Sequence, residues 1–215
     1  MGFSTNFSGI LDRFFKKHKS SVLPFLYHPA VIEAKALEET TSSEEKIKIR
    51  KKGIRNLNAK IPGASNFRYR EFIKSDTAIR RGIDNTPTEA YWRNIERLAV
   101  NVLQPARKNS GRIRITSGYR SSALNKAIKG SETSLHCFGC AADIEPLIVS
   151  VSLLDLLEWI YNNCEFRELI AEFFDQDGWV HVGYVKGRNA KKLKLKDKDH
   201  NYKLVSLDYI KNLYK

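Results

Sequence analysis

Residues 134–143 read Ser-Leu-His-Cys-Phe-Gly-Cys-Ala-Ala-Asp, and residues 179–181 read Trp-Val-His. Imidazole nitrogens and carboxylate oxygens are good zinc ligands, and three of them leave the fourth tetrahedral position open for water. His136, Asp143 and His181 therefore predict a hydrolytic Zn²⁺ site rather than a structural one. Taken alone, the same three residues could also be ordinary polar residues of a core or a surface.

The spacing of these residues predicts where they lie. Six residues separate His136 from Asp143, too many for adjacent turns of one helix. They fit a loop followed by a strand, and Gly139 permits the turn between them. Residues 179–185 alternate in polarity like a strand, so His181 comes from a separate element and tertiary folding completes the site.

Hydrophobic patterns and capping signals predict an α+β fold, a small antiparallel sheet with flanking helices. Thr86-Pro87-Thr88-Glu89 reads as a helix start with Thr86 as the cap, and Pro105 as the end of that helix. Helices are also expected after Ser121 and Ser152. Strands are expected over 112–116, 141–145 and 179–185, and residues 166–173 fit either a helix or a strand.

Two segments upstream of these residues add to the pattern and make it similar to a known family. Residues 117–125 read Ser-Gly-Tyr-Arg-Ser-Ser-Ala-Leu-Asn, after Ser-Asp-Thr-Ala at 75–78 and Gly-Ile-Asp-Asn-Thr-Pro at 82–87. Together with 134–143 they resemble the zinc D-Ala-D-Ala carboxypeptidases and their phage endolysin relatives, over roughly residues 67–185. The resemblance implies a Hedgehog/DD-peptidase-like fold, with His136, Asp143 and His181 as the zinc ligands.

The same resemblance implies roles for residues beside the ligands. It assigns Arg120 to substrate binding and oxyanion stabilisation, a role suited to a guanidinium fork, although a surface ion pair is the alternative. It assigns Ser134 to peptide binding. Tyr119 also matches the motif, either as a substrate-binding residue or as one that shapes the loop.

The sequence differs from the family pattern at the position of the general base. Many relatives carry Glu or Asp three residues before the last His, where this chain has Gly178. Asp177 is the preferred candidate because residues 175–178 favour a turn that would bring it back toward the metal. Glu172 is the second candidate, in a Leu-Ile-x-Glu segment that resembles phage-type relatives. Glu172 would also suit a buried support for a ligand His.

Length and charge suggest three regions. The 215 residues carry a net charge of +13, which favours polyanionic partners such as anionic envelope polymers, lipid or nucleic acid. We expect a helical and basic extension over 1–62, a zinc peptidase domain over 63–186 and a basic tail over 187–215. Alternating Lys and Leu at 192–196 fit either an edge strand or a tail that binds the envelope or nucleic acid.

Three Cys, an odd number, exclude a full disulfide framework. Cys137 and Cys140 form a Cys-x-x-Cys, but no second pair is present for a zinc ribbon. Because the pair lies inside the loop between His136 and Asp143, both are expected to be small fillers of that loop.

The first residues lack a signal-peptide pattern, and no run approaches a membrane span. We expect synthesis in the cytoplasm and action at the cell wall or periplasm, after lysis or as a virion component. The leading hypothesis is a zinc peptidase of peptidoglycan stem peptides, an endolysin-type endopeptidase or a D-Ala-D-Ala carboxypeptidase. The alternative is a non-catalytic, metal-containing envelope-binding or phage structural module. Nucleic-acid binding rests on charge alone, and the oligomeric state is open.

Overall fold

The computed structural model describes residues 55–214. These residues belong to one compact unit. Most of the expected helical and basic extension over 1–62 lies outside the described residues.

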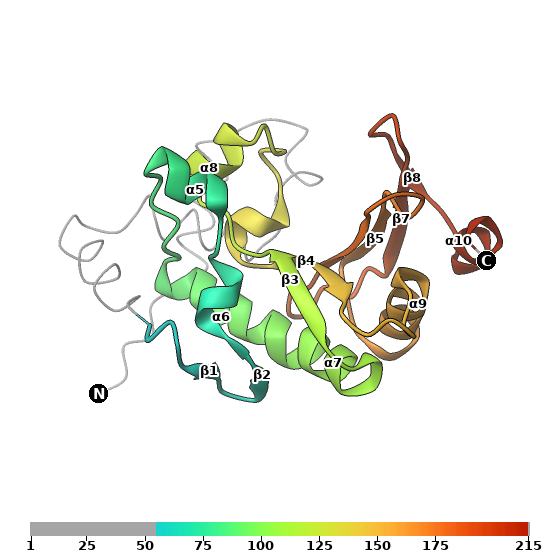
Figure 1. Cartoon of the computed structure of the whole chain (residues 1–215), viewed down its shortest axis with the longest axis horizontal. Coiled ribbons are helices and arrows are strands. Elements are labelled where there is room, and N and C mark those ends of the chain that lie inside the picture. Colours follow the sequence, from blue (N-terminus) through green and yellow to red (C-terminus); the bar gives the residue numbers. More distant parts are fainter. Residues whose placement is uncertain (1–54, 215) are drawn as a thin grey trace, which may run out of the picture. The chain divides into compact units, whose positions relative to one another are not determined.

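A six-stranded sheet forms the centre of this unit (Figure 1). The strand order is β3-β4-β6-β5-β7-β8, and every neighbouring pair is antiparallel except β5 and β7, which are parallel. The α+β prediction is confirmed, with this parallel pair as a departure from an all-antiparallel sheet. The bounds are β3 Ile113–Ser117, β4 Ala141–Pro146, β5 Glu168–Glu172, β6 Trp179–Gly183, β7 Lys192–Lys196 and β8 Tyr202–Leu204.

Helix α9 (Leu153–Asn163) covers the apolar face of the sheet. It packs against β4, β5 and β6, and also contacts α7 (Gln104–Ser110) and α10 (Leu207–Leu213). Strand residues on the apolar face are buried, as are the α9 side chains; they are Ile144, Leu169, Ala171, Val180, Val182, Leu193 and Leu195 on the strands and Leu156, Leu157 and Ile160 on the helix. Since successive side chains of a strand point to opposite faces, the polar residues between them share the other face.

A long helical segment runs along the unit in three parts (Figure 1). These are α6 (Glu89–Leu98), a π-helical segment η2 (Ala99–Leu103) and α7 (Gln104–Ser110). The prediction that Pro105 ends the helix is wrong, because the wider π turn before it accommodates a residue that lacks an N–H. The predicted cap is also two residues early: Thr88 Oγ1 accepts from the Tyr91 N–H at 3.4 Å.

Other predicted elements match closely. Ser121 caps α8 (Ser122–Ala127), Ser152 opens α9 with a capping box, and the ambiguous segment before Phe173 forms β5. Short elements complete the unit: β1 Lys60–Ile61, β2 Ala64–Arg68, η1 Tyr69–Phe72, α5 Asp76–Arg81, η3 Leu135–Phe138 and α10 Leu207–Leu213.

The sheet does not follow the expected division into regions. Residues 192–196 form β7 between β5 and β8, so the strand alternative holds for this segment, although the edge strand is β8. Residues 60–61 form β1 and pair with β2. A domain cut at 63 and 186 would therefore remove one strand from the hairpin and two strands from the sheet.

Ending the chain at residue 186 is expected to unfold the described unit. It removes Leu193, Leu195 and Ile210, whose side chains are 4%, 5% and 0% exposed. Each buried side chain of this size contributes roughly 1.5–3 kcal/mol, and a domain is stable by only about 5–15 kcal/mol. Thermal unfolding followed by circular dichroism checks this result. A cooperative transition at the full-length temperature would show that the strands after 186 are dispensable.

Candidate metal centre

His136, Asp143 and His181 come together on the polar face of the sheet, all three buried. His136 Nε2 lies 3.2 Å from Asp143 Oδ1 and 3.2 Å from His181 Nδ1, and His181 Nδ1 lies 2.8 Å from Asp143 Oδ1. Ligand atoms about 2.0–2.1 Å from a tetrahedral zinc lie about 3.4 Å from one another. The three donor atoms are thus arranged as one zinc ion requires.

The partners of the outer ring nitrogens place the inner nitrogen of each imidazole toward the centre. His136 Nδ1 donates to the Gly118 carbonyl at 2.6 Å, which leaves Nε2 as the ligand atom. His181 Nε2 lies 3.6 Å from Glu168 Oε1, which leaves Nδ1 as the ligand atom. Metal-bound His side chains typically have a partner at the outer nitrogen. His136 has one, and the buried His181 Nε2, which makes no hydrogen bond among the described residues, faces the Glu168 carboxylate, so the residues present fit zinc.

Local structure places each ligand. His136 lies in η3, which ends at Gly139 in the left-handed conformation with φ 67°. A Cβ at Gly139 would lie 2.6 Å from the Tyr91 carbonyl oxygen of α6, so only glycine fits there. Asp143 and His181 are directly opposite each other on β4 and β6. Opposed residues of an antiparallel pair lie on the same face, and this register brings the second and third ligands together.

The charges around the centre favour a cation. Burial lowers the pKa of His136. Burial opposes ionisation of the Asp143 carboxyl, but His136 and His181 hold its pKa well below its usual value. Burial also disfavours a charged His181 ring, yet Asp143 and Glu168 outweigh this effect and raise its pKa to about 9. A buried position that retains a positive charge is one where a metal ion would be stabilised.

Zinc binding at pH 7 is expected to release a proton. The metal-free cluster holds a proton near His181, whose pKa is about 9, and a metal ligand must lose it. Calorimetry in buffers of different ionisation enthalpy measures the number released. The metal-free protein should also lose stability as pH rises from about 6.5 to about 9, because a raised pKa stabilises only the protonated side. A buffer-independent binding enthalpy at pH 7 would contradict this result.

Arg120 points its guanidinium at the centre. One terminal nitrogen lies 3.8 Å from Asp143 Oδ2, and the buried Nε atom has no hydrogen-bond partner among the described residues. The Arg120 N–H donates to the His136 carbonyl at 3.2 Å. Asn85 fixes this loop, since its Nδ2 donates to the Tyr119 carbonyl and its Oδ1 accepts from the Ser121 N–H. Because the Arg120 side chain is 17% exposed, its guanidinium beside the candidate ligands suits an incoming oxygen atom.

The other two residues assigned to the substrate lie close by in the chain. The Tyr119 ring is 6% exposed and packs on Tyr91, with ring centroids 5.7 Å apart. This position fits a residue that shapes the loop. Ser134 is half-buried immediately before η3, so it lies two residues from the first ligand.

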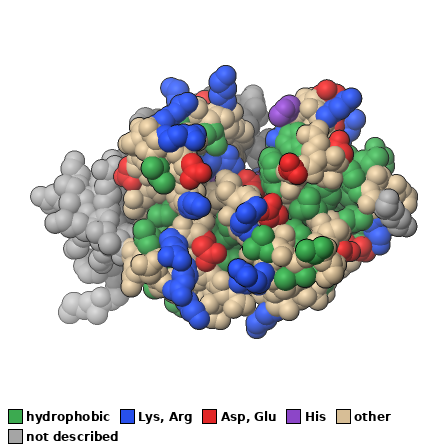
Figure 2. Space-filling view, viewed as in Figure 1, with side chains coloured by type: hydrophobic (Ala, Val, Ile, Leu, Met, Phe, Trp, Pro, Cys, Tyr) green, Lys and Arg blue, Asp and Glu red, His purple; other side chains and the backbone are tan. Residues whose placement is uncertain are grey.

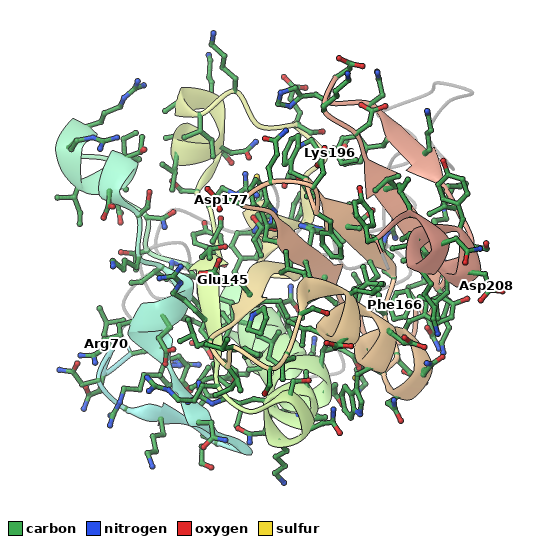
Figure 3. All side chains as sticks on the ribbon, turned by 45° about the vertical axis from the view of Figure 1, so that its right-hand side comes forward. Arg70, Glu145, Phe166, Asp177, Lys196 and Asp208 are labelled. Atoms are coloured by element: carbon green, nitrogen blue, oxygen red, sulfur yellow. The ribbon has the colours of Figure 1, made fainter. Side chains whose placement is uncertain are left out.

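The two base candidates occupy different surroundings at the same end of the sheet. Asp177 is exposed in the turn after β5, and Figure 3 shows it at the same end as Lys196, away from Phe166. Glu172 is buried at the end of β5, and its Oε2 accepts from Lys196 Nζ at 2.9 Å. By register Glu172 opposes Trp179, so it shares the face of His181.

Position 178 cannot carry the acid found in many relatives. A Cβ there would collide with the carbonyl oxygens of Glu172 and Phe173. The turn is thus tight because backbone approaches backbone, and glycine is needed for space rather than for a positive φ. The two candidates from the sequence, Glu172 at the end of β5 and Asp177 in the turn, therefore remain.

Sequence reasoning missed Glu168 and Lys194. Glu168 Oε2 accepts from Lys194 Nζ at 2.7 Å, while its other oxygen faces His181. Burial opposes ionisation of Glu168, but His181 and Lys194 lower its pKa to about 2. The carboxylate beside the outer nitrogen of His181 is therefore Glu168, whereas Glu172 pairs with Lys196. The alternation of β5 was the available signal, since it puts both glutamates on the face of His181.

The three thiols are free and buried, as expected for packing residues. Burial raises the pKa of Cys140 to about 12 and also raises the pKa of Cys137. Thiols in this state are poor nucleophiles and poor redox groups. Cys137 and Cys140 therefore fill the loop between the first two ligands.

The surface carries many cations, with acidic side chains between them on the face that Figure 2 shows. Within residues 55–214 no helix combines the length and apolar character needed to cross a membrane.

Comparison with known proteins agrees with this centre. The sequence profile described as Peptidase M15 matches residues 65–183, which include all three candidate ligands and Arg120. A comparison with curated proteins finds no match. The Peptidase M15 family consists of zinc-dependent peptidases, and its matched region ends at the last residue of β6. Because the match covers more than half of the sequence, the chain belongs to the Peptidase M15 family.

Proposed function

We propose that this protein is a zinc-dependent peptidase that hydrolyses peptidoglycan stem peptides, as an endolysin-type endopeptidase or a D-Ala-D-Ala carboxypeptidase. The observation that carries the proposal is that three candidate ligand atoms lie within 4.8 Å of one another. The outer nitrogen of His136 contacts the Gly118 carbonyl, and that of His181 faces Glu168. Family membership implies a peptidase. The wall substrate rests on the resemblance of residues 75–87 and 117–143 to wall-cleaving relatives.

Hydrolysis of a peptide bond requires three functions, and different residues would supply them. His136, Asp143 and His181 would hold the ion, and a bound zinc supplies Lewis acidity that acidifies water and polarises a carbonyl. Arg120 would donate to the oxygen on which negative charge develops. A carboxylate near the ligands must accept the proton of the attacking water and return it to the leaving amine.

We assign that carboxylate to Glu172, which reverses the preference drawn from the sequence for Asp177. Glu172 lies on the ligand-bearing face, and its Oε2 accepts a hydrogen bond from Lys196 Nζ, which holds the carboxylate at that end of β5. Its neighbour diagonal on β6 is His181, and such diagonal pairs lie about 7–8 Å apart at Cα, within reach of a glutamate side chain. Asp177 is exposed and makes no hydrogen bond or ion pair within the described residues.

Replacing Arg120 by Lys is expected to reduce kcat on the order of 10²–10³-fold, equal to roughly 2.7–4 kcal/mol in the barrier. Lysine keeps the charge but lacks the planar fork. Zinc content should stay normal, since Arg120 is not a ligand. Steady-state kinetics on a soluble stem peptide, with metal analysis of the same sample, measures both. Normal turnover in Arg120→Ala would show that the residue is structural.

The place of action is part of the proposal. Action at the cell wall or periplasm, after lysis or from a virion, would bring the protein to anionic envelope polymers. Cations of the C-terminal region remain exposed for such contacts, among them Lys186, Arg188, Lys192 and Lys198. Lys194 and Lys196 instead form ion pairs within the sheet.

Loss of turbidity of permeabilised bacteria tests the function. Zinc-loaded protein should clear the suspension, and chelator or His181→Ala should prevent clearing. A folded protein that binds zinc and cell walls without clearing them or releasing peptides would favour the alternative, a non-catalytic envelope-binding or phage structural module.

A further inference from the structure

An ion pair between Lys194 and Glu168 lies beside the candidate ligand His181, and Lys194 is outside the region that matches the family. Lys194 Nζ lies 2.7 Å from Glu168 Oε2, and Glu168 Oε1 lies 3.6 Å from His181 Nε2. The matched region ends at residue 183, whereas Lys194 is on β7. We propose that Glu168 and Lys194 are positioning residues that hold the His181 ring with Nδ1 toward the metal. The proposal rests on the zinc function proposed above.

The backbone is built to let Glu168 reach His181. Glu168 opposes Gly183 on β6, while His181 lies two residues away on the same face. A Cβ on Gly183 would lie 3.0 Å from Glu168 Cγ and 2.6 Å from Leu135 Cδ1. The missing side chain leaves the space through which Glu168 extends along β6, while Leu135 beside it precedes the first ligand. Gly183 therefore allows one carboxylate to contact a ligand from the neighbouring strand.

The parallel pairing of β7 with β5 supplies the cation. In this register Lys194 is beside Ile170 and Lys192 is beside Glu168, with the β7 lysines on the polar face. Lys194 is about one-quarter exposed and Glu168 about one-fifth, as side chains, so water screens the pair only partly. An isolated Glu168 could turn to solvent. With Lys194 on one oxygen, the other oxygen remains beside His181.

The alternative is an ion pair with a purely structural role. The two roles predict different zinc affinities once the pair is removed. A carboxylate that orients a ligand His and raises its basicity changes metal affinity typically 10–100-fold when it is removed. An ion pair that only joins β5 to β7 would change stability and leave the affinity of the folded protein unchanged.

The test is a zinc competition titration of the full chain against a chromophoric chelator. Glu168→Leu removes the contact with His181 and should weaken zinc binding about 10–100-fold. Lys194→Met keeps the stem of the side chain but removes the charge, and should weaken binding in the same direction. Lys194→Arg should restore wild-type affinity. The d–d spectrum of the cobalt-substituted protein should change in Glu168→Leu, because the ring of one ligand is no longer fixed.

Lys192→Met is the matched control, since Lys192 is exposed on the same strand and makes no ion pair within residues 55–214. It should leave both affinity and spectrum unchanged. Wild-type affinity in folded Glu168→Leu and Lys194→Met would overturn the positioning role. An equal loss of zinc affinity in Lys192→Met would show that the effect of Lys194→Met comes from net charge and not from positioning of His181. Absence of zinc binding in the wild type would instead overturn the proposed function, which keeps the two failures distinct.

Discussion

Replacing His136, Asp143 or His181 by Ala is expected to remove zinc and abolish peptidase activity. Each contributes one of three ligand atoms within 4.8 Å of one another, and two protein ligands do not make a tight zinc site. Metal analysis of protein purified without chelator should give one zinc per wild-type chain and little in each variant. The activity loss should be complete, because the ion supplies the Lewis acid of the reaction.

The loss of zinc must be separated from loss of the fold. Burial of these ligands means that the Ala variants remove side chains from the protein interior. Circular dichroism of metal-free wild type and metal-free variants should therefore be compared first. Cys164→Ala is a suitable control, since this buried thiol is not among the candidate ligands, and it should keep full zinc. Full zinc occupancy in folded His181→Ala would mean that the ligand set is wrong.

Glu172→Gln is expected to leave zinc bound and to lower kcat about 10²–10⁴-fold. The amide keeps the size of the side chain but cannot take a proton from water, and a positioned base contributes a factor of this size. Single-turnover kinetics on a soluble stem peptide measures the chemical step. Asp177→Asn should retain near-normal turnover, because Asp177 lies in an exposed turn.

The reverse pattern would return the base to Asp177. Glu172→Gln also loses its ion pair with Lys196, so Lys196→Met serves as the control for that loss. If Lys196→Met is as inactive as Glu172→Gln while both hold zinc, the pair acts together. A normal rate in zinc-loaded Glu172→Gln together with an inactive Asp177→Asn would contradict the assignment made here.

Much of the centre was predictable because its parts are local. The segment 134–143 contains the first candidate ligand, the glycine turn and the second candidate ligand, and Pro146 marks the end of the strand that follows. The family motif assigned His181 to the same centre, and the register of β4 with β6 explains why it arrives there. Capping boxes such as Ser152 with Asp155 also depend on near neighbours, so α9 was placed correctly.

The parts that were missed depend on partners distant in the sequence. Glu168 pairs with Lys194, which lies 26 residues later in the sequence. The parallel pairing of β5 with β7 brings the two together, and no local sequence pattern predicts that pairing. Lys-Leu-Lys-Leu-Lys was equally consistent with a tail, because only the burial of Leu193 and Leu195 distinguishes a strand. Gly178 indicated a turn, but the collision that excludes a side chain there involves the carbonyl oxygens of Glu172 and Phe173.

Mass analysis of the products from a defined peptidoglycan stem peptide tests the central claim most directly. The full chain, loaded with one equivalent of zinc, should cleave one peptide bond of the stem, and the product masses identify the bond. Chelator should stop the reaction, and added zinc should restore it. Intact peptide after incubation with folded, zinc-loaded protein, from both stem peptides with a D-Ala-D-Ala end and cross-linked ones, would contradict the account.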